Sequence, residues 1–266
     1  MLKKYISKLF SIFNLSIIKK DKLIQIDVER KNFRHEVERL KFIFLNERVK
    51  NPRKLYDYVE VTESQIFQDL FVLNELNFKE GGYFIEIGAA NGKYLSNTYL
   101  LEKNFNWKGL VVEPARIWEQ DIKKNRDCDI SNDCVYSESD LKIEFNETEK
   151  PEFSTVNFDL EKQEDSHEQL RKINNTIYEL KTISINNLFE NFNVPKNFDY
   201  LSIDTEGTEF EIINSLDFDT YNISIITIEH NYTPNREKIY SLLKNNNYKR
   251  VLEEFSKFDD WYVKQK

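Results

Sequence analysis

Four apolar stretches of the chain have the length and β-branched composition of buried strands, and each reaches a carboxylate at or near its end. Helix-like stretches separate them, which predicts βα units and a mostly parallel, doubly wound α/β sheet with helices on both faces. The apolar stretches are Tyr83–Gly88, Gly109–Pro114, Tyr200–Asp204 and Ile225–His230. Ligands of such sheets bind beyond the carboxyl ends of the strands. A row of acids there predicts a site for a cationic or hydroxyl-rich ligand and argues against a phosphate site.

The rest of the pattern predicts the order of the other elements. Helices are expected over about residues 64–77, 94–104, 116–125, 184–192, 208–216 and 235–246, with a further strand over about 132–137. Two closing strands, over about residues 248–255 and 260–264, predict an antiparallel pair at the C-terminal edge of the sheet. The polar stretch over about residues 146–181 lacks a clear period, and its length predicts a hairpin edge with a lid-like excursion.

Two helical patterns precede this α/β region, one over residues 1–20 and one over about residues 27–50. They predict an N-terminal helical extension over residues 1–58 and an α/β domain over residues 59–266. We expect these helices to pack on their own domain, with homo-oligomer formation and peripheral membrane contact as alternatives. Their apolar positions are Leu2, Tyr5, Ile6, Leu9 and Phe13 in the first pattern and Phe33, Val37, Leu40 and Phe44 in the second.

Composition narrows the class of protein. The 266 residues are 40% hydrophobic and 14% aromatic, which is enough for one sizeable core, and the net charge of −8 disfavours a nucleic-acid-binding surface. The two cysteines, Cys128 and Cys134, match no paired metal motif and favour a reducing compartment. The N-terminus lacks a signal-peptide core, and no run reaches the about 18 apolar residues of a membrane span. We therefore predict a cytoplasmic protein.

The first apolar stretch opens into the glycine-rich turn Gly88–Gly92, with the sequence Gly-Ala-Ala-Asn-Gly. Such a turn lets a ligand approach the backbone, and the helix beyond it can receive a carboxylate. A dinucleotide-binding turn would have a glycine where Ala90 stands. The spacing instead suits S-adenosylmethionine, which has no phosphates but offers a carboxylate, an ammonium, a sulfonium and a ribose diol. Glu86 can then face the cationic portion, and Glu113 can accept hydrogen bonds from both ribose hydroxyls.

Three further groups, Asp204, Glu229 and His230, lie at the ends of the last two predicted parallel strands. The ends of neighbouring strands in a doubly wound sheet would bring them to one point beside the methyl group of the cofactor. Methylation of a hydroxyl requires removal of its proton, and His230 or Asp204 could act as the general base. Alternatively, the three groups could hold Mg²⁺ or Mn²⁺, which would acidify the hydroxyl. Glu209 is expected to stabilise the first turn of the following helix.

Four segments form ordered motifs: 84–92 (Phe-Ile-Glu-Ile-Gly-Ala-Ala-Asn-Gly), 107–114 (Trp-Lys-Gly-Leu-Val-Val-Glu-Pro), 203–209 (Ile-Asp-Thr-Glu-Gly-Thr-Glu) and 227–231 (Thr-Ile-Glu-His-Asn). Over about Ser64 to Val263, the chain resembles the FkbM-type S-adenosylmethionine-dependent methyltransferases. Residues 64–69 are similar to the family's Ser-Gln-x-Gly-x-Asp helix, with Phe67 in place of its glycine. The resemblance implies a Rossmann-like class I methyltransferase fold and O-methylation of sugars, glycans or polyketide-type products.

We therefore predict an O-methyltransferase that moves a methyl group from S-adenosylmethionine to a sugar hydroxyl, in a nucleotide-sugar or in a surface or capsular glycan. A methyltransferase for a non-sugar hydroxyl, a nicotinamide-dependent oxidoreductase and a non-catalytic adaptor are the alternatives. The predicted catalytic residues are Asp204, Glu229 and His230, and the same three form the predicted metal site. The predicted cofactor-binding residues are Glu86, Gly88, Ala89, Asn91, Gly92, Glu113, Pro114, Ser137 and Asp204.

Overall fold

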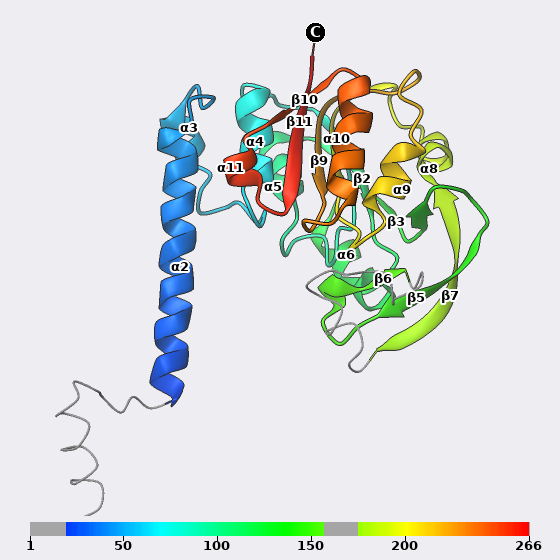
Figure 1. Cartoon of the computed structure of the whole chain (residues 1–266), viewed down its shortest axis with the longest axis horizontal. Coiled ribbons are helices and arrows are strands. Elements are labelled where there is room, and N and C mark those ends of the chain that lie inside the picture. Colours follow the sequence, from blue (N-terminus) through cyan, green and yellow to red (C-terminus); the bar gives the residue numbers. More distant parts are fainter. Residues whose placement is uncertain (1–19, 157–174, 266) are drawn as a thin grey trace, which may run out of the picture. The chain divides into compact units, whose positions relative to one another are not determined.

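The computed structural model describes residues 20–156 and 175–265 of the chain (Figure 1). The chain forms two compact units, and the division between them falls between Pro52 and Arg53. The second unit holds the α/β region and every predicted site residue. The predicted helix over residues 1–20 lies almost wholly outside the described residues.

The first unit contains the long helix α2 (Lys20–Leu45), and the short helix α3 (Pro52–Tyr56) begins at the division. This agrees with a predicted helix in the second pattern. Within α2, however, Leu40 and Phe44 are exposed, whereas Phe42 and Ile43 are buried. The apolar face predicted for the C-terminal part of this helix is therefore wrong.

A seven-stranded sheet forms the centre of the second unit, with the strand order β10-β11-β9-β8-β1-β2-β3 (Figure 1). The strands from β9 to β3 in this order are parallel, and β11 is antiparallel to both of its neighbours. The strands are β1 (Tyr83–Ile87), β2 (Lys108–Val112), β3 (Asp129–Ser131), β8 (Asn197–Ile203), β9 (Asn222–Glu229), β10 (Tyr248–Val251) and β11 (Asp259–Lys264). This sheet confirms the predicted doubly wound architecture. Its order changes direction between β1 and β8, which is where ligands of such sheets bind.

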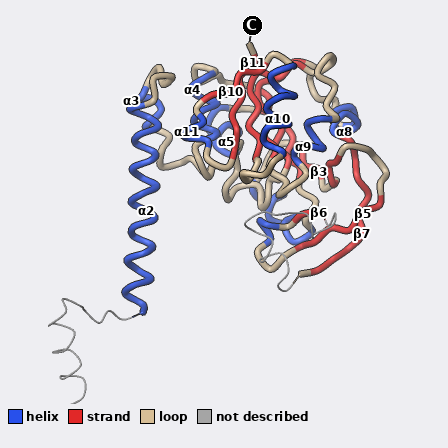
Figure 2. Tube along the Cα trace, viewed as in Figure 1, coloured by secondary structure: helices blue, strands red, loops and turns tan. Residues whose placement is uncertain are grey.

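Helices cover both faces of this sheet because side chains of each strand alternate between the faces (Figure 2). On one face, Ile85 and Ile87 of β1 belong to a buried cluster with residues of α8, α9 and α10. On the other face, Phe84 lies under the guanidinium of Arg126, at the end of α6. The helices are α4 (Gln68–Glu75), α5 (Tyr99–Phe105), α6 (Glu119–Asn125) after the 3-10 turn η1 (Arg116–Trp118), α8 (Ile185–Asn191), α9 (Glu209–Asn214), α10 (Asn235–Asn245) and α11 (Glu253–Ser256).

Two of these helices begin later than the sequence pattern predicts. Before α4, Phe67 has a φ of 76°, the left-handed conformation in which a glycine is most easily accommodated. Phe67 thus adopts a backbone shape that suits the glycine of the family motif, and its side chain is buried. Before α5, the segment around Leu95 pairs with Ser64 in an isolated bridge, and the helix starts only at Tyr99.

A smaller, four-stranded sheet lies beside the carboxyl ends of the parallel strands, with the order β4-β7-β5-β6. Its strands are β4 (Cys134–Tyr136), β5 (Lys142–Glu147), β6 (Thr155–Val156) and β7 (Thr176–Ser184). The antiparallel pair of β5 and β7 matches the predicted hairpin edge only in part, because most of β5 precedes residue 146, and the predicted lid lies largely outside the described residues. The strand predicted over about residues 132–137 is present as β4, but it pairs with β7 of the smaller sheet, whereas β3 before it forms the edge of the larger sheet.

Two further features concern membrane spans and cysteines. Among the described residues, no helix is both long enough and apolar enough to cross a bilayer. Cys128 and Cys134 are free thiols, and Cys134, in β4, is buried in the apolar cluster of the smaller sheet.

Candidate active site

A cavity of about 370 Å³ opens at the carboxyl ends of β1, β2, β8 and β9, beside the smaller sheet. This volume is in the range of sites that enclose one small ligand. Among the described residues that line it, seven are acidic and none is lysine, arginine or histidine. The acids are Glu86, Glu113, Asp133, Glu152, Asp204, Glu206 and Glu229. Such a wall suits a ligand that carries hydroxyl groups or positive charge.

Three residues of the glycine turn line the cavity: Gly88, Ala89 and Ala90. Gly88 has a φ of 87°, and a Cβ atom on it would overlap the backbone carbonyl oxygen of Asp204. The close approach of the ends of β1 and β8 therefore requires glycine at this position. The N–H groups of Gly88 and Ala89 both donate to the carbonyl of Val112, at 2.9 and 3.2 Å. These amides are thus used within the sheet and do not form an anion-binding nest.

Asn91 and Gly92 are not among the residues that line the cavity. The side-chain oxygen of Asn91 accepts hydrogen bonds from the N–H groups of Lys93 and Tyr94, at 2.9 and 2.7 Å. Gly92 has a φ of 78°, and a Cβ atom on it would press on the side chain of Arg126. The structure therefore gives these two predicted cofactor-binding residues a part in shaping the turn.

Glu86 lines the cavity, but its carboxylate is engaged by the segment that precedes α5. Oε1 accepts a hydrogen bond from the N–H of Asn97 at 2.6 Å, and Oε2 accepts the hydroxyls of Ser96 and Thr98 at 2.8 and 2.6 Å. The guanidinium of Arg126 lies 3.3 Å from Oε2. Glu86 is thus bonded to the segment directly before α5, and it anchors the loop that forms one wall of the cavity.

Glu113 follows β2 in the cavity wall and keeps acceptor capacity. Its Oε2 accepts the N–H of Ala90, and its Oε1 accepts the N–H of Ala115, both at 2.8 Å. Each carboxylate oxygen can accept a further hydrogen bond. Burial is the largest cause that raises the pKa of Glu113 to about 7. Pro114 lines the cavity beside it.

Ser137 follows β4 and is not among the residues that line the cavity, whereas Asp133, Cys134 and Val135 are. One carboxylate oxygen of Asp133 accepts the hydroxyl of Ser131 at 2.6 Å, which fixes the turn between β3 and β4. Sequence analysis missed Asp133 because it treated this turn as part of one continuous strand. The residues before Asp133 are mostly polar, with Ile130 as the one large apolar residue of β3, so the sequence offered no clear signal for this acid.

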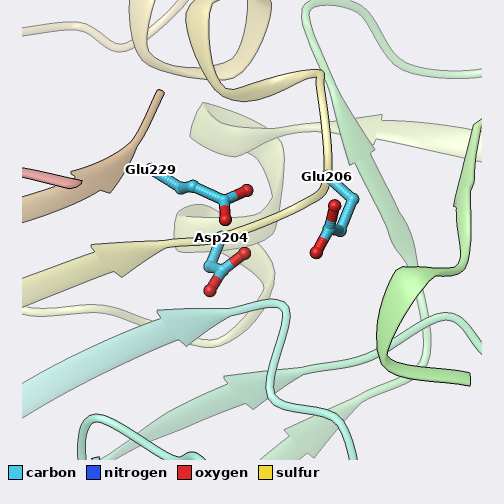
Figure 3. A group of neighbouring side chains, drawn as sticks. All are labelled: Asp204, Glu206 and Glu229. Atoms are coloured by element: carbon cyan, nitrogen blue, oxygen red, sulfur yellow. The ribbon is translucent and has the colours of Figure 1, made fainter. Parts of the chain in front are cut away.

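Asp204, Glu206 and Glu229 converge where β8 and β9 end (Figure 3). One ligand oxygen of each carboxylate lies within 4.8 Å of the other two, and Figure 3 shows the three side chains turned toward one another. Burial, and then the nearby Glu206, raises the pKa of Asp204 well above its ordinary value. Burial, and then Asp204, does the same to the pKa of Glu229. The predicted pair of Asp204 and Glu229 is therefore brought together, with Glu206 as an unforeseen third member.

The turn that presents Glu206 is held by Glu209. The carboxylate of Glu209 accepts the N–H groups of Thr205 and Gly207, both at 2.9 Å. Glu206 itself has a φ of 59°, which is uncommon for a residue with a side chain. A turn of this kind has no hydrophobic period, so the sequence pattern gave no indication of the direction of the Glu206 side chain.

His230 does not join the acids and does not line the cavity. It directly follows Glu229, and successive side chains of an extended chain point to opposite sides. Its Nδ1 accepts the N–H of Tyr232 at 2.9 Å, and its Nε2 lies 3.7 Å from Asp260. Burial is the largest cause that lowers its pKa. The geometry thus corrects the predicted set of Asp204, Glu229 and His230, because Glu206 takes the position expected for the histidine.

Two exposed tyrosines border the cavity. Tyr94 is 55% exposed and Tyr232 is 69% exposed, and both line the cavity. Asn231 and Tyr232 have φ values of 42° and 58°, and the N–H of Asn231 donates to the carbonyl of Phe258. The ring of Tyr232 packs edge-on against His230 at 5.3 Å. The histidine therefore supports an aromatic residue at the rim of the cavity.

The strand order, the glycine turn beside the switch point and the acid after β2 define a Rossmann-like fold of the class I methyltransferase type. Residues 86–261 match the family model of the methyltransferase FkbM domain. The chain belongs to this family.

Solved structures similar to this chain include three methyltransferases. Methyltransferase FkbM from Methylobacillus flagellatus KT has 12% sequence identity and a TM-score of 0.47, and the match covers 80% of this chain and 51% of that one. Precorrin-6y C5,15-methyltransferase from Geobacter metallireducens GS-15 has 13% identity and a TM-score of 0.37, over 73% of this chain and 86% of that one. A TehB-like SAM-dependent methyltransferase from Corynebacterium glutamicum ATCC 13032 Kitasato has 10% identity and a TM-score of 0.36, over 81% of this chain and 100% of that one. The chain thus spans about half the length of the first of these, and no curated protein matches it.

Proposed function

We propose that the chain is an S-adenosylmethionine-dependent O-methyltransferase that acts on a sugar hydroxyl, in a nucleotide-sugar or in a surface or capsular glycan. The observation that carries this proposal is the cavity at the switch point, with its seven acids and no basic residue among the described ones that line it. S-adenosylmethionine carries both positive charge and a ribose diol. Membership of the FkbM methyltransferase family supports the same class of reaction.

The strand order supports one orientation of the bound cofactor, because the acids of the cavity follow successive strands of the sheet. Asp133, after β3, can accept a hydrogen bond from the amino group of adenine, and Glu113, after β2, can accept those of the ribose hydroxyls. Asp204, after β8, can accept one from the ammonium group. S-adenosylmethionine, when bound, supplies a methyl group on a positively charged sulfur. Glu206 and Glu229 then lie beside the acceptor, and Asp204 can contact both the cofactor and the acceptor.

The acids beside the acceptor site have a defined part in the proposed transfer. The acceptor oxygen forms a bond to the methyl carbon, the bond from that carbon to sulfur breaks with its electron pair left on sulfur, and the hydroxyl proton must depart. A carboxylate of Asp204 or Glu229 can orient the hydroxyl and take this proton. His230 lies outside the cavity, so its proposed part changes from general base to support of Tyr232.

The rim and charge of the cavity favour an uncharged sugar portion as the acceptor. The exposed rings of Tyr94 and Tyr232 can cover the apolar face of a sugar ring, while the acids accept its hydroxyls. The diphosphate of a nucleotide-sugar would have to lie outside this acidic cavity. A non-sugar hydroxyl compound with a similar apolar face stays the nearest alternative.

The other two alternatives have less support. A nicotinamide-dependent oxidoreductase needs free turn amides for its pyrophosphate, yet the N–H groups of Gly88, Ala89 and Ala90 are all bonded within the protein. A non-catalytic adaptor would not need an intact row of buried acids, which are costly to desolvate. We propose a cytoplasmic location because both cysteines are free thiols. Assembly or membrane contact through the N-terminal helices is a separate proposal, which needs residues outside the described ones.

Incubation with S-adenosylmethionine labelled in its methyl group tests the proposed function. We expect label to pass to a sugar hydroxyl of a glycan, a free sugar or a nucleotide-sugar, in a panel that also contains polyphenols. An Asp204→Asn variant should not transfer label, which controls for contaminating enzymes. Binding of S-adenosylmethionine without transfer to any sugar would contradict the acceptor class, and binding of a nicotinamide cofactor in its place would contradict the reaction.

The affinity for S-adenosylmethionine is expected to rise with pH through about 7. The carboxylate form of Glu113 accepts the ribose hydroxyls better than the protonated form, and the pKa of Glu113 is about 7. Glu113→Gln should weaken binding by about 1.5–3 kcal/mol above that pH, roughly ten- to a hundred-fold, and flatten the pH profile. Calorimetric titration across this range measures both effects. Glu119→Gln is the matched control, because the Glu119 side chain on α6 is 46% exposed. An unchanged affinity in Glu113→Gln would remove Glu113 from the site.

A further inference from the structure

Three carboxylates meet at one end of the cavity, and the described residues that line this cavity include no lysine, arginine or histidine. Asp204 and Glu206 come from the turn after β8, and Glu229 comes from the end of β9. Their ligand oxygens lie within 4.8 Å of one another, and Glu206 and Glu229 are only 7% and 5% exposed. Buried carboxylates at such distances repel one another strongly unless a positive charge or protons intervene.

A second observation points to a ligand at this position. Oε2 of Glu229 is buried and has no hydrogen-bond partner among the described residues. Figure 3 shows the Glu229 carboxylate directed toward Asp204 and Glu206, and all three side chains line the open cavity. A buried carboxylate oxygen without a partner costs free energy unless something in the site binds it.

We propose that Asp204, Glu206 and Glu229 bind a divalent, oxygen-preferring cation such as Mg²⁺ or Mn²⁺. Three carboxylates supply the hard oxygen ligands and the negative charge that these ions prefer, and the cavity side leaves room for water or a hydroxyl. Glu206 is the ligand that replaces His230 in this set, and an all-oxygen set favours Mg²⁺ and Mn²⁺ over zinc. The cation would bind the acceptor hydroxyl and lower its pKa, a role that rests on the proposed function, whereas the binding itself does not.

Titration of the full chain with Mn²⁺ alone, followed by electron paramagnetic resonance, tests the proposal without cofactor or acceptor. We expect one bound ion per chain, displaced by Mg²⁺, and at least about tenfold weaker binding in Glu206→Gln. Glu152→Gln is the matched control, because Glu152 lines the same cavity but lies outside the three. Its Mn²⁺ affinity should equal that of the unaltered chain.

Circular dichroism and S-adenosylmethionine binding show whether each variant is folded. If Glu206→Gln does not fold, Glu229→Gln replaces it in the same titration. Absence of Mn²⁺ binding by the unaltered chain, or equal binding by the folded variant, would overturn the cation site and leave the proposed methyl transfer standing. Binding of Mn²⁺ at these residues without any binding of S-adenosylmethionine would support the cation site and contradict the proposed function.

Discussion

Glu229→Gln is expected to slow methyl transfer at least about a hundred-fold while the affinity for S-adenosylmethionine stays within about threefold. The substitution keeps the shape of the side chain and removes a buried negative charge beside the acceptor position. Glu229 lies at the end of β9, beyond the strands β3, β2 and β8 whose acids are assigned to the cofactor. The proposed contacts of the cofactor therefore remain in the variant. Initial rates on an acceptor identified from the sugar panel, with calorimetric titration of the cofactor, measure the two quantities separately.

Glu237→Gln is the matched control for this substitution. Glu237 lies on α10, where its side chain is 73% exposed, and it makes one long ion pair of 4.0 Å with Arg250. Its loss should change neither the rate nor the cofactor affinity. A Glu229→Gln enzyme that turns over at the unaltered rate would show that the acids at this end of the cavity take no part in the transfer.

Arg126→Ala is expected to lower the free energy of unfolding of the α/β unit by about 3–5 kcal/mol. The Arg126 side chain is completely buried, and it pairs with Glu102 at 2.6 Å and with Glu86 at 3.3 Å. It also donates to the carbonyl of Gly92 and to the hydroxyl of Thr98. Its removal leaves the buried carboxylate of Glu86 without its cation, while Glu102 keeps only its pair with Lys103 at 2.8 Å. Because the same contacts hold the loop before α5, cofactor affinity should fall as well.

Urea unfolding followed by fluorescence measures this loss, with Lys123→Ala as the control. Lys123 pairs with Glu119 across one turn of the same helix, but both side chains are about half exposed. An exposed pair of this kind contributes about 0.3–0.5 kcal/mol, so the control should unfold almost as the unaltered chain does. Equal stabilities of the two variants would mean that the Arg126 network is not a main support of the site.

The local pattern was sufficient to predict the sheet. Short apolar runs separated by amphipathic stretches allow few arrangements other than parallel strands with crossing helices, and connections between them are almost always right-handed. Parallel strands end at a common edge, so acids after those runs had to lie near one another. Glu113, Asp204 and Glu229 could therefore be assigned to the cavity edge from sequence, as could the need for glycine at position 88.

The direction of individual side chains at that edge was decided only by the tertiary structure. Within a strand, successive side chains point to alternate faces, so their directions follow from the sequence. This alternation ends with the strand, and the conformation of the turns beyond it depends on hydrogen bonds with distant segments. Glu206 enters the cavity because Glu209 holds a left-handed turn, and His230 leaves it because its ring accepts the amide of Tyr232. Glu86 anchors a loop because Arg126 approaches from a helix 40 positions later in the chain. The sequence by itself therefore determined which edge of the sheet holds the ligand site, because hydrophobic periodicity and strand order are regular. The atoms that face the ligand depend on long-range contacts, which no local pattern contains.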